Sequence, residues 1–204
     1  MRTIAFIDAS NLFYGGEKSL GWKVDCHKLR LYLQKKYTVK TAYYFGGVEI
    51  GKFPFDYTYF GIVPIVPLLK YFDDCIEREP GNSYLLRQYM KKVRFYSKLE
   101  QFGYSLCLKP VKIYHQSDGT IKKKANCDVD MTFYFMKEKN YFDRAVILSG
   151  DGDFLLVLQY LQQLGKEVII LARGSRTARE LRQFAGANFR DFVRLRNSIE
   201  WNEK

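Results

Sequence analysis

The sequence has few of the residues that build zinc sites and disulfide frameworks. It contains only two histidines, His27 and His115, and its four cysteines are scattered without a CxxC pair. Zinc sites in proteins are built from closely spaced cysteines and histidines, so no zinc site is expected. Unpaired, scattered cysteines are typical of reduced thiols and favour a cytoplasmic location.

Long hydrophobic runs are also lacking. The longest one, YFGIVPIVPLLKYF at residues 59–72, is interrupted by two prolines and a lysine. A membrane-spanning helix needs about 20 consecutive apolar residues, so no membrane association is expected. The N-terminus, MRTIAFIDAS, runs directly into a strand-like segment and has no features of a signal peptide.

Several nucleotide and hydrolase motifs are missing as well. No GxGxxG follows a strand-like run, and neither a GxxxxGK[ST] loop nor a GxSxG elbow is present. These absences argue against a dinucleotide site, a Walker-type nucleoside triphosphate site and a serine hydrolase of the α/β type.

Acidic residues are fewer than basic residues in this chain. Thirty-three Lys and Arg residues face twenty-two Asp and Glu residues, which gives a net charge of +11 and a pI near 9.4. An excess of this size favours a polyanionic partner such as RNA, although net charge also serves solubility.

Five apolar runs alternate with segments that have helical spacing. The runs lie at residues 3–7, 40–47, 104–110, 144–150 and 166–174, and the helix-like segments include 84–102, 153–164 and 177–186. Gly103 and Gly165 stand where two of these helices should end. The pattern predicts a single α/β domain over residues 1–204, with a doubly wound, mainly parallel sheet and helices on both faces.

Two segments depart from this alternation. Residues 52–83 contain four prolines and many aromatic residues, and we interpret them as a partly helical insertion that could form a substrate lid or the interface of a homodimer. Residues 115–124 predict a hairpin with its turn at Asp118 and Gly119.

Aspartates gather where the strands should end. Asp8 closes the first run, Asp151 and Asp153 follow the fourth, and Asp128 and Asp130 stand where a loop turns into a helix. Each of them alone is explained by capping of a helix N-terminus. Three groups at one sheet edge repel each other, however, and a Mg²⁺ or Mn²⁺ ion would relieve that repulsion.

The two aspartates of the SGDGDF turn are expected to have different roles. They stand two residues apart, so their side chains do not face the same way at a helix start. We expect Asp151 to face the metal, and Asp153 to bind it through water or to cap the following helix.

Four motifs resemble those of a known family. FIDASNL, KANCDVD, ILSGDGDF and GKEVIILA are similar, in order and spacing, to the motifs of NYN domains, in particular the LabA-like branch of the PIN-like nucleases. The resemblance implies a PIN-like fold and a ribonuclease that depends on Mg²⁺ or Mn²⁺. It implies that the catalytic and metal-binding residues are Asp8, Asp128, Asp151 and Asp153, with Asn11 as a polar catalytic residue and Ser149 beside the metal or the substrate phosphate.

One position departs from the family pattern. Members often carry a further acidic residue six positions after the one that matches Asp128, and this chain has Tyr134 there. Asp130 could compensate, but it stands at a different angle on the helix. The departure puts the strength of catalysis in question.

Basic residues suggest where RNA would lie. Arg173, Arg176 and Arg179 begin at the same sheet edge as the aspartates, and Lys124 precedes Asp128 within a run of three lysines. A stripe on the helix-like segment 84–102 contains Arg87, Lys91, Arg94 and Lys98. The alternative for each group is a solvated surface, which is the usual role of charged runs.

Three functions remain open at this stage. The first is an endoribonuclease in which a carboxylate-bound ion activates water. The second is a catalytically weak or inactive RNA-binding module with the same fold, as the Tyr134 departure suggests. The third is a haloacid-dehalogenase-type phosphatase, because SGDGDF is superficially similar to a motif of that family. Ser10 stands where such an enzyme would have its second aspartate.

Overall fold

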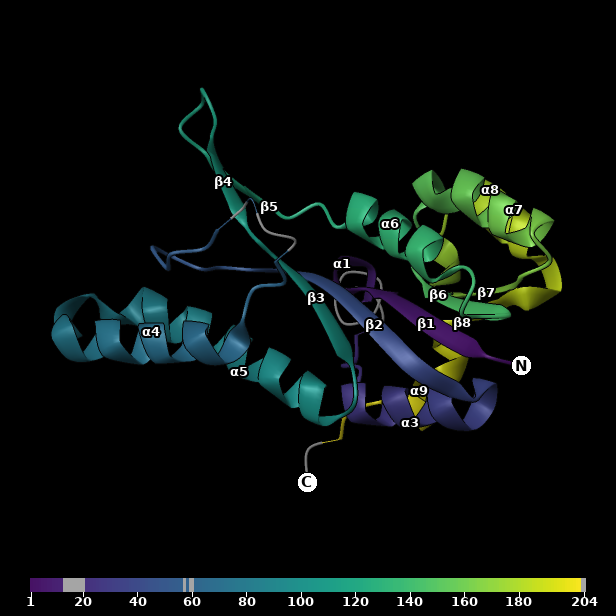
Figure 1. The fold of residues 1–204 in the computed structure, drawn as a ribbon, viewed down its shortest axis with the longest axis horizontal. Helices are drawn as coiled ribbons and strands as arrows, with labels where there is room; N and C mark the ends of the chain where they lie inside the picture. The colour runs from purple at the N-terminus through teal and green to yellow at the C-terminus, as the bar shows by residue number, and fades with distance from the viewer. Residues whose placement is uncertain (13–20, 57, 59–60, 203–204) are drawn as a thin grey trace.

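The centre of the fold is a six-stranded sheet with the strand order β3-β2-β1-β6-β7-β8 (Figure 1). The computed structural model describes residues 1–12, 21–56, 58 and 61–202. Every pairing within this sheet is parallel. Its strands are β1 (Thr3–Asp8), β2 (Val39–Val48), β3 (Ser105–Pro110), β6 (Arg144–Leu148), β7 (Glu167–Ala172) and β8 (Phe189–Asp191). The chain builds the sheet outward in two directions from β1, so the strand order reverses between β1 and β6.

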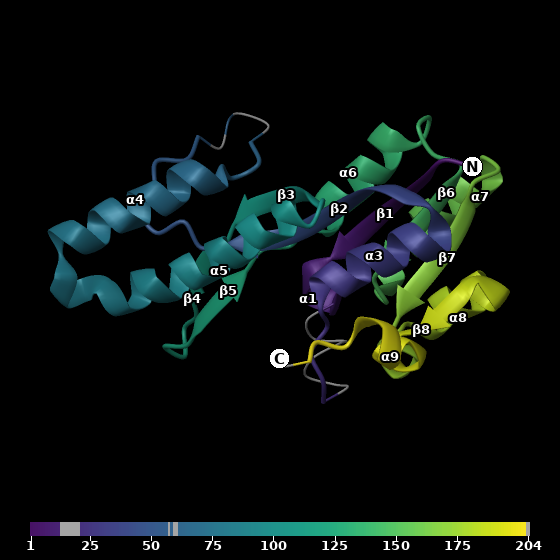
Figure 2. The same cartoon turned by 90° about the horizontal axis from the view of Figure 1, so that it is seen from below.

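Helices cover both faces of the sheet, as the sequence predicted (Figure 2). In β1, Ile4 and Phe6 belong to one hydrophobic core, whereas Ala5 and Ile7 belong to the other. The first core includes residues of α6 (Asp128–Glu138), α7 (Leu155–Gln163) and α8 (Arg179–Ala185). The second includes residues of α3 (Cys26–Tyr37), α5 (Ser83–Gln101) and α9 (Arg196–Ile199). Both faces of a parallel sheet are therefore buried, which explains the continuous apolar runs.

The predicted helices end where their glycines stand. Gly103 follows α5 with φ +86° and Gly165 follows α7 with φ +74°, a conformation that favours glycine. The inward face of α5 is the predicted one, with Met90, Val93, Tyr96 and Leu99 buried. Neither the edge strand β8 nor the helix α3, whose first turn is capped by the carboxylate of Asp25, was predicted.

Two pairs of elements extend beyond the sheet. The helix α4 (Ile65–Arg78) lies along α5, with Ile65, Leu68 and Phe72 buried (Figures 1 and 2). The antiparallel hairpin of β4 (Lys112–His115) and β5 (Ile121–Lys124) turns at the predicted Gly119, with φ +79°. The role of residues 52–83, like the single-domain organisation, stays a prediction.

None of the described helices is long and apolar enough to cross a bilayer. The remaining elements are single turns. These turns are α1 (Ala9–Leu12), η2 (Pro80–Asn82), η3 (Gly152–Phe154), η4 (Gly174–Arg176), η5 (Gly186–Asn188) and η6 (Phe192–Leu195).

Candidate functional site

Asp8 lies at the carboxyl end of β1, beside the point where the strand order reverses. Open parallel sheets bind their ligands at such points. Its side chain is only 7% exposed, and its Oδ1 accepts hydrogen bonds from the Ser10 N–H (2.9 Å), the Ser10 hydroxyl (2.6 Å) and the Asn11 N–H (3.3 Å). These contacts fix the carboxylate in one orientation. The charge of Asp8 is therefore held at the switch point by the turn that follows β1.

Ser149 connects the ends of β1 and β6. Its hydroxyl is fully buried, donates to Asp8 Oδ2 over 3.2 Å and accepts a hydrogen bond from the Asp151 N–H over 3.3 Å. The sequence suggested that Ser149 would lie beside the metal or the phosphate. In the structure it is a positioning group that orients two of the aspartates at once.

The two aspartates of the SGDGDF turn lie in different environments. Asp151 Oδ1 accepts the N–H of Asp153 over 3.0 Å and so caps η3, whereas Asp153 is exposed. Of the two expected roles of Asp153, capping is taken by Asp151, and binding of the metal through water stays a prediction. The reason for the capping is local: Asp151 has an extended backbone, with φ −77° and ψ 123°, which is the conformation of a capping residue.

The glycines of this turn are required by close packing. A Cβ on Gly150 would lie 2.8 Å from Thr177 Oγ1 and 3.1 Å from Thr177 Cα, and one on Gly152 would lie 2.5 Å from Glu180 Oε1. The Gly150 carbonyl also accepts the Ala178 N–H over 3.0 Å. The turn is thus pressed against the segment that enters α8.

Asp128, the first residue of α6, lies within the electrostatic reach of the other three aspartates. Its N–H donates to Asn126 Oδ1 over 3.0 Å. Partial burial raises the pKa of Asp128, and the negative charges of Asp8, Asp151 and Asp153 raise it further, while Lys124 acts in the opposite direction. The charges of Asp8, Asp151 and Asp153 thus act on Asp128, and the joint role of these four aspartates stays a prediction. We refer to Asp8, Asp128, Asp151 and Asp153 as the acidic cluster.

The chemistry of the acidic cluster fits a hard divalent ion. Carboxylate oxygens are the ligands that Mg²⁺ and Mn²⁺ prefer, and the neighbouring carboxylates, after partial burial, contribute to the raised pKa of Asp128. Within the described part of the chain, no three His, Cys, Asp or Glu side chains are placed to hold a metal ion. The cluster thus has suitable donors and a surplus of negative charge, without the geometry of a closed metal site.

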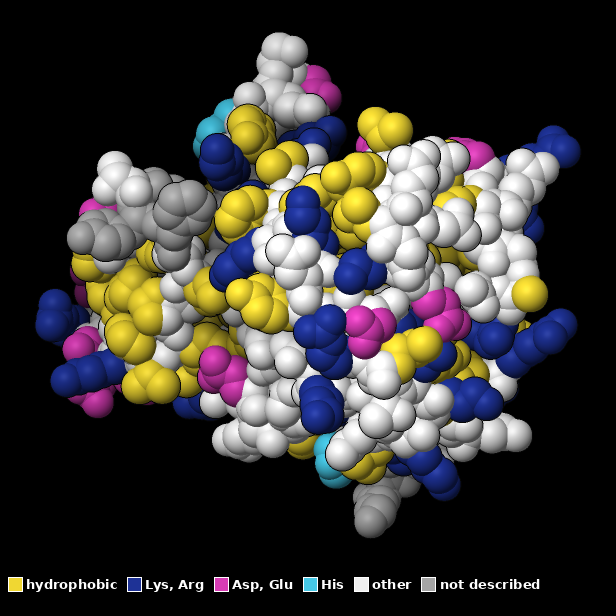
Figure 3. Space-filling view, turned by 45° about the vertical axis from the view of Figure 1, so that its right-hand side comes forward, with side chains coloured by type: hydrophobic (Ala, Val, Ile, Leu, Met, Phe, Trp, Pro, Cys, Tyr) yellow, Lys and Arg dark blue, Asp and Glu magenta, His cyan; other side chains and the backbone are white. Residues whose placement is uncertain are grey.

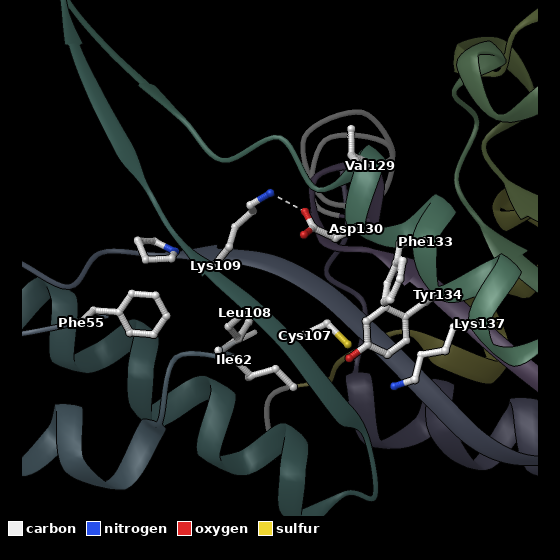
Figure 4. Close-up of a pocket in the computed structure, with 12 residues that line it drawn as sticks. Phe55, Ile62, Cys107, Leu108, Lys109, Val129, Asp130, Phe133, Tyr134 and Lys137 are labelled. Carbon is white, nitrogen blue, oxygen red and sulfur yellow. Dashed lines mark hydrogen bonds and ion pairs between the residues drawn. The ribbon is translucent and has the colours of Figure 1, made fainter. Parts of the chain in front are cut away.

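Asp130 and Tyr134 line a pocket of about 720 Å³ between α6 and the edge strand β3 (Figure 4). The carboxylate of Asp130 forms an ion pair with Lys109, which also donates to the Asn126 carbonyl over 2.9 Å. Tyr134 packs edge-on against Tyr43 and Phe45. Lys109 was not recognised from the sequence, because nothing in the strand SLCLKP predicts its contact with α6.

Tyr134 supplies no carboxylate at the position where the family often has one. Burial and a hydrogen bond with Cys107 raise the pKa of Tyr134, so its hydroxyl stays neutral. The ring closes one side of the pocket and carries the Lys137 ammonium over its face, 4.9 Å from the centroid. Asp130, which could compensate for the missing acid, forms its ion pair with Lys109.

The predicted basic residues lie on three parts of the surface. Arg173 follows β7, and its Nη1 is buried without a hydrogen-bond partner among the described residues. Lys124 is exposed and close enough to Asp128 to influence its pKa. The other candidates, which are exposed, lie on η4, α8 and α5: Arg176, Arg179, Arg87, Lys91 and Arg94. Figure 3 shows one face on which Lys and Arg side chains lie beside acidic ones.

Comparison with known proteins identifies the family. The family model described as "NYN domain" matches residues 2–192, which is most of the chain. The chain belongs to the NYN domain family. Its NYN domain thus falls within the PIN-like nuclease superfamily, in agreement with the mostly parallel α/β fold.

Two known proteins are similar over nearly the whole chain. "Low amplitude and bright protein LabA" of Synechococcus elongatus is 24% identical over 208 residues, which cover 100% of this chain and 90% of that protein. A crystal structure of a protein of unknown function from Vibrio parahaemolyticus has a TM-score of 0.62 at 19% identity, covering 98% of this chain and 96% of the other. The second likeness concerns the fold alone.

Membership of the NYN family argues against one of the three functions that the sequence suggested, the haloacid-dehalogenase-type phosphatase. The matched family is not that of the haloacid-dehalogenase phosphatases. Ser10, at the position of that family's second aspartate, donates both its N–H and its hydroxyl to Asp8. The SGDGDF motif therefore belongs to the NYN pattern, and its similarity to the phosphatase motif is superficial.

Proposed function

We propose that this NYN domain is a metal-dependent endoribonuclease that cleaves RNA phosphodiester bonds with Mg²⁺ or Mn²⁺. The observation that supports the proposal is the Ser149 hydroxyl that links Asp8 and Asp151 at the switch point of the sheet, with Asp128 near enough for their charges to raise its pKa in addition to the larger effect of its partial burial. Four carboxylates in a strongly basic protein of a nuclease superfamily are best explained by a cation that they share.

The proposed roles follow from the contacts of each side chain. Asp8, Asp128, Asp151 and Asp153 would hold the ion, which would activate a water molecule and offset charge on the leaving oxygen of the phosphodiester. Ser149 keeps Asp8 and Asp151 oriented through its buried hydroxyl. Asn11, whose backbone N–H bonds Asp8, is proposed as a polar residue of the catalytic site.

Binding of the RNA backbone is assigned to the cations around the acidic cluster. Arg173 has a buried nitrogen without a partner, and a phosphate oxygen would satisfy it. Lys124 lies beside Asp128. Arg176 and Arg179 extend the positive surface beyond β7, and the α5 stripe of Arg87, Lys91 and Arg94 is a more distant candidate.

Mutation of the acidic cluster tests the proposal. RNA cleavage is measured with Mg²⁺ and with Mn²⁺ for the wild type, Asp8→Asn, Asp151→Asn and the control Asp73→Asn, an exposed aspartate on α4. We expect the two cluster variants to lose about 100-fold or more of the activity, and Asp73→Asn to keep it. Cleavage that survives both cluster substitutions would show that the site is wrong.

A second candidate function is an RNA-binding module without turnover. Tyr134, packed against Tyr43 and Phe45 where the family often has an acid, favours it. This candidate predicts RNA binding that weakens with salt and no metal-dependent cleavage by the wild type. Cleavage that disappears in Asp151→Asn would eliminate it.

A further inference from the structure

The β4–β5 hairpin projects from the carboxyl edge of the sheet, away from the helices that cover it (Figure 1). All eight residues of its two strands are exposed. Its base is fixed on β2, because the Val111 N–H donates to the Val48 carbonyl over 2.9 Å and a Cβ on Gly47 would lie 2.4 Å from Ala125 Cβ. The hairpin is thus a two-stranded ribbon with a packed base and exposed strands.

The strand register divides the ribbon into two different faces. Residues directly opposite each other in an antiparallel pair lie on the same face, and the faces alternate along each strand. Lys112 is opposite Lys124 and Tyr114 is opposite Lys122, so these four residues share one side, which we call the basic face. The other side contains Ile113, Lys123, His115 and Ile121.

The second side of the ribbon contacts the body of the protein at Lys123. Lys123 Nζ lies 3.9 Å from Glu49 Oε1, just beyond the end of β2, and 5.3 Å from the centroid of the Tyr89 ring on α5. Glu49 also pairs with Lys92 of α5, at 3.1 Å. These contacts hold one side of the hairpin, and the basic face therefore points away from α5.

The basic face concentrates positive charge that the protein does not neutralise. Lys112 and Lys124 occupy directly opposite positions, and Lys122 follows two residues away, about 7 Å along the strand. Within the described residues, none of these three lysines has an ion pair. Like charges directly opposite each other destabilise a hairpin, so the face would gain stability from a polyanion.

The position of the basic face connects it with the acidic cluster. Lys124 ends β5 four residues before Asp128, the first residue of α6. The face thus begins beside the cluster and continues outward through Lys112 and Lys122. Tyr114, 48% exposed, stands among the lysines and offers a ring on which a base could stack.

We propose that the basic face, formed by Lys112, Tyr114, Lys122 and Lys124, binds the sugar-phosphate backbone and a base of the RNA strand that leads into the acidic cluster. The proposal rests on the proposed function for its partner, RNA. It adds that one side of the hairpin is the binding surface and that Lys123, on the other side, is a structural residue.

The salt dependence of RNA binding tests the proposal without any need for cleavage. Affinity for a single-stranded RNA is measured in EDTA over a range of salt concentrations for the wild type and for the triple variant Lys112→Gln, Lys122→Gln, Lys124→Gln. Each phosphate contact contributes about 0.7 to the slope of log K against log salt. The slope is negative, and we expect its magnitude to be smaller by about 2 in the triple variant than in the wild type. An unchanged slope would overturn the proposal.

Two sets of control variants separate the basic face from net charge. The triple variant Lys35→Gln, Lys36→Gln, Lys40→Gln removes the same charge at the opposite edge of the sheet and should keep the slope within about 0.5 units. Within the hairpin, Lys122→Gln should lower the slope, whereas Lys122→Arg and Lys123→Gln should not. Equal losses in Lys122→Gln and Lys123→Gln would show that the binding surface is not one-sided.

The stacking role of Tyr114 has a matched control in Tyr141. Both tyrosines are exposed, but Tyr141 lies between α6 and β6, at the amino edge of the sheet. Tyr114→Ala should weaken RNA binding roughly tenfold with little change in the salt slope, and Tyr141→Ala should not weaken it. Equal affinities of Tyr114→Ala and the wild type would remove the base contact from the proposal.

Failure of this inference is distinguishable from failure of the proposed function. If the wild type cleaves RNA through Asp8 but the triple hairpin variant binds RNA with an unchanged slope, only the inference is wrong. If the slope falls as expected but no variant cleaves RNA with Mg²⁺ or Mn²⁺, the inference stands and the proposed function does not. Binding of the basic face to vesicles of acidic phospholipid, without binding to RNA, would overturn the choice of partner.

Discussion

Ser149 shows how much of the candidate site depends on one buried hydroxyl. Its hydroxyl donates to Asp8, at the end of β1, and accepts the N–H of Asp151, which follows β6. Its neighbours at the edge of the sheet are charged and need a fixed arrangement to act together. We regard Ser149 as the residue that fixes Asp8 and Asp151 relative to each other.

Ser149→Ala should destabilise the protein by about 1–3 kcal/mol, because the Asp151 N–H loses its hydroxyl partner beside a buried carboxylate. The measurement is the midpoint of urea unfolding, with the exposed Ser175→Ala as a control that should change it little. Equal midpoints for Ser149→Ala and the wild type would show that the hydroxyl has no positioning role.

The raised pKa of Asp128 predicts how stability depends on pH. An acid whose pKa is higher in the folded state binds more protons there, so stability falls as pH rises from the unfolded to the folded pKa. Asp128→Asn should therefore stabilise the metal-free protein at pH 7, by less than about 1 kcal/mol because the group is partly exposed. The gain should vanish below about pH 4, where Asp128 is protonated in both states.

Asp143 provides a control of opposite sign for this experiment. Hydrogen bonds from Arg2 lower the pKa of Asp143 to about 2. Its contribution to stability is present above the unfolded pKa and is lost as pH falls through about 2, so Asp143→Asn should destabilise the protein at pH 7. Unfolding at several pH values measures both variants. If Asp128→Asn destabilised the metal-free protein at pH 7, the repulsion inferred within the cluster would be wrong.

At the scale of elements, the site depends on how closely the SGDGDF turn packs against the start of α8. Gly150 lies against the side chain and the backbone of Thr177, whereas Gly152 lies against the end of the flexible Glu180 side chain and against Ala178. Backbone atoms cannot move aside as a glutamate can. The two glycines should therefore differ in their tolerance of a Cβ atom.

Gly150→Ala should destabilise the protein by about 1–3 kcal/mol through overpacking, and Gly152→Ala by less. The control is Gly81→Ala, where a Cβ would meet nothing within 4 Å, and it should be neutral or slightly stabilising. Urea unfolding of the three variants gives the comparison. A larger loss in Gly152→Ala than in Gly150→Ala would contradict this account of the turn.

At the scale of the whole molecule, the acidic cluster is a local exception to an overall excess of positive charge. The net charge is +11, yet the charges of three aspartates act on Asp128 near the switch point of the sheet. A polyanion would be repelled by that point unless a cation occupied it. The proposed function therefore requires two ligands, a divalent ion and RNA.

A divalent ion that binds the folded protein should raise its melting temperature. At a free Mn²⁺ concentration ten times the Kd, linkage predicts about 1.4 kcal/mol of stabilisation, which corresponds to roughly 3–6 °C for a chain of this length. Asp8→Asn and Asp128→Asn should lose most of this shift, and Asp73→Asn should keep it. A Mn²⁺ shift of the same size in all four proteins would place the binding elsewhere.

Local sequence pattern was sufficient for most of the framework. The five apolar runs became strands because a parallel sheet buries both faces of each strand, and the helices end at Gly103 and Gly165 because glycine tolerates positive φ. The edge strand β8 has only three residues, too few for a periodic signal. The helix α3 was overlooked although Leu29, Leu33 and Tyr37 recur every four residues behind the capping Asp25.

The same pattern predicted that Asp8 and Asp151 lie at one edge, because parallel strands present their carboxyl ends together, and the structure links them through Ser149. Only the tertiary structure decided what their side chains do. The Ser149 bridge to Asp8 spans 141 residues, and the Lys109 pair that occupies Asp130 joins β3 to α6. The two faces of the β4–β5 hairpin likewise depend on its contact with α5. Side-chain orientation is set by such contacts between distant segments, and no local spacing encodes them.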